Sequence, residues 1–599
     1  MIATGLNAID SLLDSYTWVT TAKTPIAVTY SFMQYTPTDL TASDLLGLTQ
    51  MTAAQKVATA AALASWAAVA DITFTQVGET ATGSGGLIRF AENDQGSTSA
   101  AYTLSYNDNS TMTKAYVFLN ATESSNFNYA TGAYGINTLV HEIGHALGLK
   151  HPGDYNASGG GGTPPYLPTA TDNLDYTIMS YNNGTAQTSN YSYPAGPMLY
   201  DIQAIQYLYG ANMTYHTGND TYSFANNTVP VCIWDAGGIN TFDFSACTNQ
   251  VLINLNAGSF SQTSPGVNNV SIAYGVSIQQ AVAGSGGTTI YCNNLTDTIT
   301  GGTGNDLIVI GTGRDLIDGG GGSNTVQVTA TAHDITADTL SHIQTLDMNG
   351  QTVAMQCAQL SQFQSFLNTG GGVVLSDSGS ATGNSAISSY TLTGVGANTL
   401  TLPALTGHGS IIGATGGGLD TVVLAGSGAN YSLSKTTAGF TVAASNGLGD
   451  VALANVDRVQ AADVKVALDL GSAQHAGEAV EILGAAFGTT NITASFVGQA
   501  LSLLDSGTSM HDVCQIAIST ELFKSLDGSG NDRDVAGLIY TNVVGTLPSS
   551  TDLDYLVGML QGHGGTMSQA DFLQFAAGTL ANQTHINLAG MQLTGVAYT

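Results

Sequence analysis

The sequence predicts a multidomain chain with four parts: an α+β domain at residues 1–215, a repeat-built parallel β-structure at 216–345, a further β-rich region at 346–470 and an α-helical domain at 471–599. Three observations support this division. Helical and strand patterns mix in the first part, a nine-residue period appears near residue 283, and apolar residues spaced three to four apart return after residue 473. A chain of 599 residues is also too long to fold around one ordinary hydrophobic core.

The first part reads as alternating helices and strands. Two helix-like segments lie within residues 39–70, and four runs with alternating apolar residues are expected as strands, at 72–77, 86–93, 99–108 and 114–120. A helix that begins near residue 137, a loop rich in glycine and proline at 152–174 and a second helix at 197–210 complete the domain.

The second part contains five successive units, AGSGGTTIY, CNNLTDTIT, GGTGNDLIV, IGTGRDLID and GGGGSNTVQ, over residues 283–327. An aliphatic residue recurs every nine positions, at Ile290, Ile299, Ile308, Ile317 and Val326. The sixth position of each unit carries Thr288, Asp297, Asp306, Asp315 or Asn324. The third and fourth units match the Ca²⁺-binding nonapeptide GGxGxDxUx closely.

This repeat predicts a parallel β-roll that binds calcium. The glycines are expected to allow tight left-handed turns, and the aliphatic residues to build the core. Aspartates and backbone carbonyls supply the oxygen ligands that Ca²⁺ prefers. Each turn is expected to face the turn eighteen residues away, so that two or three ions bind between paired turns. One ion is expected between the turns of Asp297 and Asp315, and another between the turns of Asp306 and Asn324. The predicted ligands are Asp297, Gly302, Gly304, Asp306, Gly311, Gly313 and Asp315.

The remaining parts carry weaker signals. Residues 346–470 are strand-rich, with one isolated echo of the repeat, TGGGLDTVV, at 415–423. Five segments after residue 473 have helical periodicity.

Composition excludes some functions. Lysine and arginine total 11 against 42 acidic residues, and the net charge of −31 disfavours nucleic acid and anionic membranes but suits Ca²⁺. No run is long enough to span a bilayer. The five cysteines form no CxxC pair and are expected to be small buried residues, with a Cys232–Cys247 disulfide as the alternative.

The segment NTLVHEIGHALGLKHPGDY, residues 137–155, carries the strongest chemical signal. His141 and His145, four residues apart, lie on one face of a helix and can reach one ion. A straight helix would carry His151 roughly 9 Å too far along its axis. Gly148 is therefore expected to end the helix and turn the chain back, so that all three histidines bind one zinc ion.

Three protein ligands leave a fourth position for water, which is typical of a catalytic zinc. Glu142 is next to the first ligand and is predicted to act as the general base. Downstream, YTIMSY places Met179 where it can pack beneath the histidines and Tyr181 where its phenol can reach the metal.

These motifs, together with ATGLNAIDSLLDSYTW, PMLYDIQAIQYLYGAN and IWDAGG, resemble the serralysins over roughly residues 1–330. Serralysins are secreted bacterial metzincin proteases with a C-terminal repeats-in-toxin β-roll. The resemblance implies that Tyr181 binds zinc at rest and stabilises the oxyanion during peptide hydrolysis. It also implies that an extended substrate pairs with an edge strand at residues 99–106. In the first calcium loop it implies Asp235 and Gly237 as ligands, with Asn240 where the family usually has aspartate.

The expected function is therefore a secreted zinc endopeptidase that cleaves extracellular or surface proteins, has several structural Ca²⁺ ions, and leaves the cell by type I secretion through a C-terminal signal. The helical part resembles a domain of unknown function found in bacterial extracellular repeat proteins, and it is a candidate for cell-surface association. Two alternatives stay open: an adhesin-like surface protein whose protease domain serves self-processing or attachment, and an intracellular protease.

Overall fold

The computed structural model describes residues 4–156 and 160–599, which form two compact units. The first unit contains residues up to 327 together with Ala337–Gln344, and the second contains Val328–Thr336 and Thr345–Thr599. Within the described ranges, no helix has both the length and the apolar character needed to cross a bilayer.

The N-terminal part of the first unit contains a five-stranded sheet with the strand order β2-β1-β3-β5-β4. Strands β1, β2, β3 and β5 are parallel, whereas β4 pairs antiparallel with β5 and lies at the edge. The strands are β1 (Ile26–Phe32), β2 (Ile72–Gln76), β3 (Ile88–Asn93), β4 (Ala101–Asp108) and β5 (Thr111–Asn120). The segment expected to pair with substrate is thus an edge strand.

Helices α1 (Asn7–Asp10), α2 (Ala53–Val69), α3 (Tyr134–Ala146), α4 (Thr185–Asn190) and α5 (Leu199–Tyr209) accompany this sheet. Trp66 of α2 is fully buried, and its indole Nε1 donates to the carbonyl of Val140 in α3 over 3.1 Å. Only the second of the two helix-like segments expected in residues 39–70 forms a helix. The first forms turns, because the Asp44 carboxylate accepts hydrogen bonds from the backbone N–H of Thr41 and the hydroxyl of Tyr102, both over 2.8 Å.

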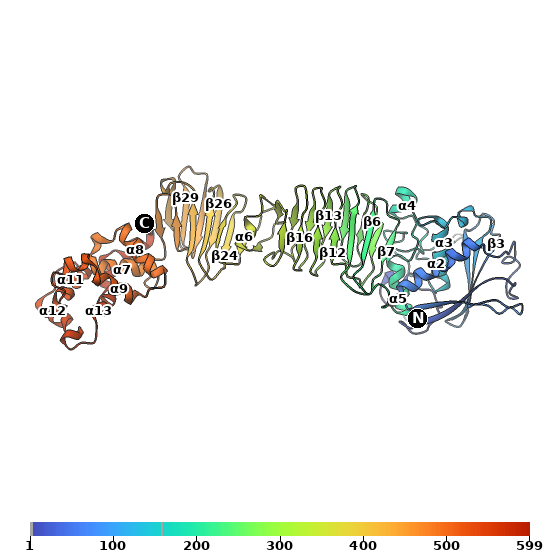
Figure 1. Ribbon diagram of the computed structural model, residues 1–599, viewed down its shortest axis with the longest axis horizontal. Helices are drawn as coiled ribbons and strands as arrows, with labels where there is room; N and C mark the ends of the chain where they lie inside the picture. The colour runs from blue at the N-terminus through green and yellow to red at the C-terminus, as the bar shows by residue number, and fades with distance from the viewer. Residues whose placement is uncertain (1–3, 157–159) are drawn as a thin grey trace. The chain divides into compact units, whose positions relative to one another are not determined.

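The predicted roll follows in the same unit, as two stacks of parallel strands (Figure 1). Ile290 pairs with Ile308 and Ile299 with Ile317, so the eighteen-residue register predicted from the repeat is confirmed. One stack contains β6 (Thr221–Ala225), β8 (Thr241–Ala246), β12 (Gln280–Val282), β14 (Thr298–Thr300), β16 (Leu316–Asp318) and β18 (Thr339–Ser341); the other contains β9 (Val251–Asn254), β13 (Thr288–Tyr291), β15 (Leu307–Val309) and β17 (Thr325–Gln327). A small sheet of β7 (Val231–Ile233), β10 (Phe260–Ser261) and β11 (Val270–Ile272) adjoins them in sequence.

The second unit also contains stacked parallel strands, although its sequence lacks the repeat. One sheet contains β20 (Val353–Met355), β22 (Val373–Leu375), β24 (Ser389–Leu392), β26 (Gly407–Ile412) and β30 (Gly449–Ala454), followed by antiparallel β29 (Phe440–Ala444) and β28 (Tyr431–Lys435). The other contains β23 (Ser380–Thr382), β25 (Asn398–Leu402), β27 (Asp420–Leu424), β31 (Arg458–Gln460), β32 (Lys465–Ala467) and β33 (Val596–Tyr598). Strands β19 (Thr345–Asp347) and β21 (Ser365–Leu367) pair in parallel, and α6 (Cys357–Leu360) is a single turn.

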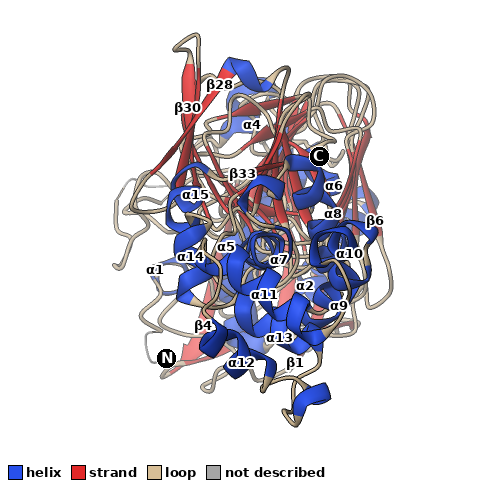
Figure 2. Ribbon diagram, turned by 90° about the vertical axis from the view of Figure 1, so that its left-hand side faces the viewer, coloured by secondary structure: helices blue, strands red, loops and turns tan. Residues whose placement is uncertain are grey.

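A helical bundle follows within this unit, as predicted for the region after residue 473. Helix α7 (His475–Phe487) is buried along most of its length and contacts several of the others (Figure 2). The bundle contains α8 (Ala494–Asp505), α9 (Met510–Ser519), α10 (Glu521–Asp527), α11 (Asp532–Val544), α12 (Ser550–Val557), α13 (Gln569–Ala577), α14 (Leu580–His585) and α15 (Leu588–Thr594).

Candidate metal centre and catalytic cleft

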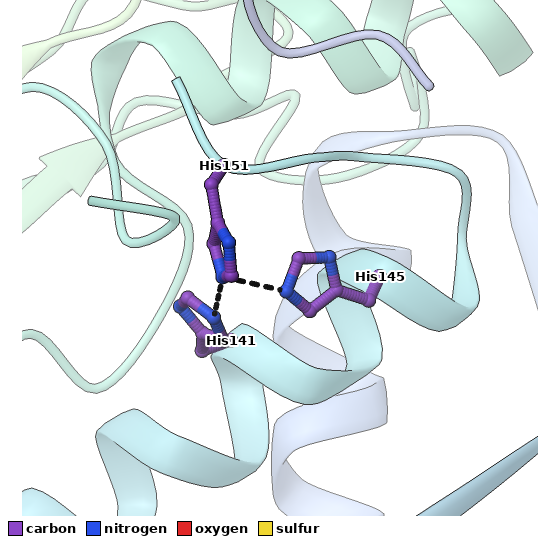
Figure 3. A group of neighbouring side chains, drawn as sticks. All are labelled: His141, His145 and His151. Carbon is purple, nitrogen blue, oxygen red and sulfur yellow. Dashed lines mark hydrogen bonds between the residues drawn. The ribbon is translucent and has the colours of Figure 1, made fainter. Parts of the chain in front are cut away.

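Three imidazoles converge at the end of α3. The helix presents His141 and His145 on one face, and it ends at Ala146. Gly148 then adopts φ +94°, a left-handed conformation, and the chain returns His151 to the same point. The Nε2 atom of His151 lies 3.1 Å from Nε2 of His141 and 3.0 Å from Nε2 of His145 (Figure 3). The chain therefore turns back at Gly148, as the spacing of the three histidines predicts.

The hydrogen-bond pattern shows which nitrogens are free. Each Nδ1 lies 2.8–3.1 Å from a backbone carbonyl oxygen, those of Ile178, Leu149 and Tyr155 for His141, His145 and His151 respectively. A carbonyl only accepts, so each neutral ring carries its proton on Nδ1 and directs the Nε2 lone pair at the other two rings. Burial and the neighbouring imidazoles lower the pKa of His141 to about 3 and that of His151 to about 2.

The Nε2 lone pair of His151 lies in van der Waals contact with those of His141 and His145, and such lone pairs repel one another unless a cation lies between them. Tetrahedral ligands at about 2.0–2.1 Å from zinc are roughly 3.3–3.4 Å apart, close to the observed nitrogen separations. Carbonyl acceptors on the outer nitrogens are also the usual second partners of zinc-bound histidines. The residues therefore fit zinc.

Glu142 lies beside these ligands and is buried. Thr103 of the edge strand β4 donates its hydroxyl to Oε2 of Glu142 over 2.6 Å, and it also contacts the Glu142 carbonyl oxygen at 2.9 Å. Burial raises the pKa of the Glu142 carboxyl, against the opposing effects of His145 and the Thr103 hydroxyl. The sequence did not identify Thr103, since nothing in its neighbourhood marks it as a partner of residue 142.

Met179 is fully buried against α3, the helix that carries His141 and His145. A Cβ atom added at Gly144 would lie 2.6 Å from the Met179 Sδ, so this helical glycine makes room for the methionine. Tyr181, two residues further on, is half exposed, and its ring centre lies 4.5 Å from that of His151. Burial and the Glu142 charge raise the pKa of the Tyr181 phenol.

Asp201 of α5 holds the turn that carries Met179. Its carboxylate is fully buried and accepts three hydrogen bonds, from the hydroxyl of Thr177 (2.6 Å), the backbone N–H of Ile178 (2.7 Å) and the backbone N–H of Met198 (2.9 Å). The carbonyl of Ile178 is in turn the partner of His141. Asp201 was not predicted, although it is the only charged residue of α5.

A cleft of about 350 Å³ opens over these groups. Residues 98–101, which lead into the edge strand β4, line it together with Tyr134, Asn137 and Thr138 of α3. Glu142, His141 and Tyr181 also reach the cleft. An extended chain in this cleft would therefore pass His141, Glu142 and Tyr181.

We expect Gly148→Ala to weaken zinc binding. Alanine at φ +94° is strained by about 1–3 kcal/mol, and its Cβ would lie 2.8 Å from Cγ2 of Thr17. Movement of the loop relieves this strain but displaces His151, so zinc affinity should fall by roughly 5- to 150-fold. Competition with a zinc-chelating dye measures the affinity.

Gly83→Ala is the matched control for this change. Gly83 has φ +87° and nothing within 4 Å of an added Cβ, so alanine at this position introduces a similar backbone strain without moving a histidine. Equal zinc affinity for Gly148→Ala and the wild-type protein would show that the turn does not position His151.

The predicted calcium residues fall into separate groups. Asp235 joins His216 and Asp220 in one cluster, and its Oδ1 accepts the backbone N–H of Gly237 over 2.9 Å. Asn240 lies close by, and its amide points at the Gly237 carbonyl over 3.4 Å. Asp297 and Asp315 lie together with Cys292 in a second cluster.

The glycines of the roll correct one expectation in part. Gly287, Gly320 and Gly322 adopt the expected positive φ, but Gly302, Gly304, Gly311 and Gly313 do not, so these four do not serve as left-handed turns. A Cβ at Gly302 would strike the carbonyl of Gly284, and one at Gly311 would strike the carbonyl of Asn293. These glycines are required because the preceding coil, eighteen residues earlier, touches their backbone.

All five cysteines are buried and unpaired, so the Cys232–Cys247 disulfide is not formed.

Comparison with known proteins agrees with this geometry. Residues 7–192 match the family model described as metallo-peptidase family M12, and residues 200–391 match that of the peptidase M10 serralysin C terminal. The chain is 41% identical to Serralysin A of Dickeya chrysanthemi over 267 residues, which are 40% of this chain and 53% of that protein. It is 36% identical to Metalloprotease AprA of Pseudomonas entomophila over 297 residues, 46% of this chain and 60% of that protein. The chain thus spans about half the length of these curated relatives.

Proposed function

We propose that the chain is a serralysin-type metalloprotease, because residues 7–192 match a metallopeptidase family, residues 200–391 match the serralysin C terminal, and the relatives include Serralysin A; as such it would be a secreted, zinc-dependent endopeptidase. The observation that carries this proposal is the convergence of the Nε2 atoms of His141, His145 and His151 beside the buried Glu142. Zinc held by these nitrogens would supply a Lewis acid that polarises the scissile carbonyl and activates water at neutral pH.

The chain's own residues supply binding and proton transfer. The substrate pairs in extended form with β4, which leaves one side of the sheet unpaired. The raised pKa of Glu142 prepares its carboxylate to take a proton from the attacking water and pass it to the leaving amine. Thr103 holds Oε2, so the other carboxylate oxygen transfers the proton. The Tyr181 phenol stays protonated because its pKa is raised, and it donates a hydrogen bond to the developing oxyanion.

The roll is proposed to bind structural calcium outside the cell. The cluster of His216, Asp220 and Asp235 is one proposed calcium position, since its two carboxylates supply oxygen ligands of the kind that calcium takes. Type I secretion is proposed from the resemblance to the serralysins. Attachment to a cell surface is proposed from the resemblance of the helical part to a domain found in bacterial extracellular repeat proteins.

Cleavage of casein by the purified full-length chain tests the central proposal. The zinc-loaded protein should cleave casein, lose this activity when 1,10-phenanthroline removes zinc, and regain it with about one equivalent of zinc. Failure of the zinc-loaded protein to cleave casein or a panel of extended peptides would overturn the peptidase assignment. Undiminished cleavage by metal-free protein would overturn the role of zinc.

A further inference from the structure

Cys292, Asp297 and Asp315 form a buried cluster in the roll. The thiol sulfur and one carboxylate oxygen of each aspartate lie within 4.8 Å of one another. The three residues are 6%, 0% and 2% exposed. The cluster joins the turn that contains Cys292 and Asp297 to the turn that contains Asp315, one coil further along.

Each aspartate uses one oxygen in the fold and leaves the other free. Oδ2 of Asp297 accepts the backbone N–H of Asn293 over 2.8 Å, and Oδ1 of Asp315 accepts the backbone N–H of Asp297 over 3.0 Å. Oδ1 of Asp297 and Oδ2 of Asp315 are buried without a hydrogen-bond partner in the described residues. A buried, unpaired carboxylate oxygen is costly, and two beside a thiol require a cation or protons.

The turns on the opposite side of the roll show a contrasting arrangement. Both oxygens of Asp306 accept backbone N–H groups, from Thr288 over 2.7 Å and Gly302 over 3.0 Å. The Asn324 amide there donates to three carbonyl oxygens, those of Gly319, Gly321 and His342, over 2.7–3.0 Å. An internal amide therefore satisfies the carbonyls of that turn, whereas the Cys292 side keeps free ligand atoms.

The donor set of the Cys292 cluster does not fit calcium. Ca²⁺ takes oxygen ligands, and a thiolate selects softer ions such as zinc, cadmium or cobalt. In the closely matching unit GGTGNDLIV the equivalent first position is Gly301, which adds no side chain. Cys292 thus places a soft ligand where the nonapeptide pattern has none.

We propose that Cys292, Asp297 and Asp315 bind one thiophilic divalent cation of the zinc class, with the Cys292 thiolate as a ligand. The thiol proton leaves to solvent when the ion binds. The ion pins one coil of the roll to the next and so replaces a calcium expected from the repeat. This proposal is independent of the peptidase activity.

Cobalt loading of the chelator-stripped full-length chain tests the proposal. Cobalt bound by a thiolate gives a near-ultraviolet sulfur-to-metal charge-transfer band, which the three-histidine centre cannot give. We expect this band in the wild-type protein, and we expect binding of two cobalt ions per chain. Cys292→Gly restores the glycine of the repeat and should lose the band and one bound ion.

Cys247→Ala is the matched control, because Cys247 is also buried in the roll but lies outside the cluster. It should keep the band, and a large excess of calcium should leave the band in place. The proposal is overturned by absence of the band in the wild-type protein, by its survival in Cys292→Gly, or by its displacement with equimolar calcium.

Discussion

Glu142→Gln is expected to lower the turnover of casein by about 10²- to 10⁴-fold while the protein keeps its zinc, because a positioned general base contributes about that factor. Glutamine keeps the shape of the side chain and an oxygen that accepts the Thr103 hydroxyl, which lies 2.6 Å from Oε2 of Glu142. It cannot take a proton from water. The three imidazoles are unaffected, since none of their hydrogen bonds involves residue 142. Turnover and zinc content of the same preparation check both parts.

Glu521→Gln provides the same chemical change at an exposed glutamate of α10 and should leave turnover unchanged. A Glu142→Gln protein that keeps zinc and more than about one tenth of wild-type turnover would show that another group is the base. A variant that loses zinc would show instead that Glu142 supports the metal centre.

The convergence of the three histidines could be predicted because their geometry is local. The helical repeat places His141 and His145 together, and a single glycine determines whether His151 can join them. The roll could be predicted for a similar reason. Its period of nine fixes which residues meet one coil later, as the pairing of Ile290 with Ile308 shows.

The supporting residues could not be predicted, because their partners are brought together only by tertiary folding. Thr103 lies 39 residues before Glu142, and Asp201 lies 24 residues after Thr177. Neither has a spacing that marks its role. The glycine roles were also misjudged, since the sequence shows that glycine is needed at Gly302 or Gly311 but not whether a positive φ or a neighbouring coil requires it.

The parallel strands of the second unit have no regular period in the sequence beyond the isolated unit at 415–423. Val353 pairs with Val373, Val373 with Tyr390, and Ser389 with Ser410, so the offset changes from coil to coil. A variable offset hides the repeat even though each strand keeps its apolar residues. The sequence pattern could therefore predict that this region is rich in strands, but not how the strands pair.

Asp201→Ala is expected to destabilise the first unit strongly and to reduce its zinc content. The change removes the acceptor of three buried donors, the Thr177 hydroxyl and the backbone N–H groups of Ile178 and Met198. Each donor left unpaired in this buried site costs about 1–3 kcal/mol. The combined cost is therefore a large share of the roughly 5–15 kcal/mol that stabilises a typical domain. Thermal unfolding followed by near-ultraviolet circular dichroism measures the loss.

The loss of zinc follows from the position of this carboxylate. Asp201 fixes Ile178, whose carbonyl is the partner of the His141 Nδ1 atom, and the same turn places Met179 beneath Gly144. Asp201→Asn, which keeps one acceptor oxygen, should fall between alanine and the wild-type protein in both stability and zinc content. Asp108→Ala, at an exposed position of β4, should change neither. Wild-type stability and zinc content in Asp201→Ala would mean that the packing of Met179 alone holds this turn against α3.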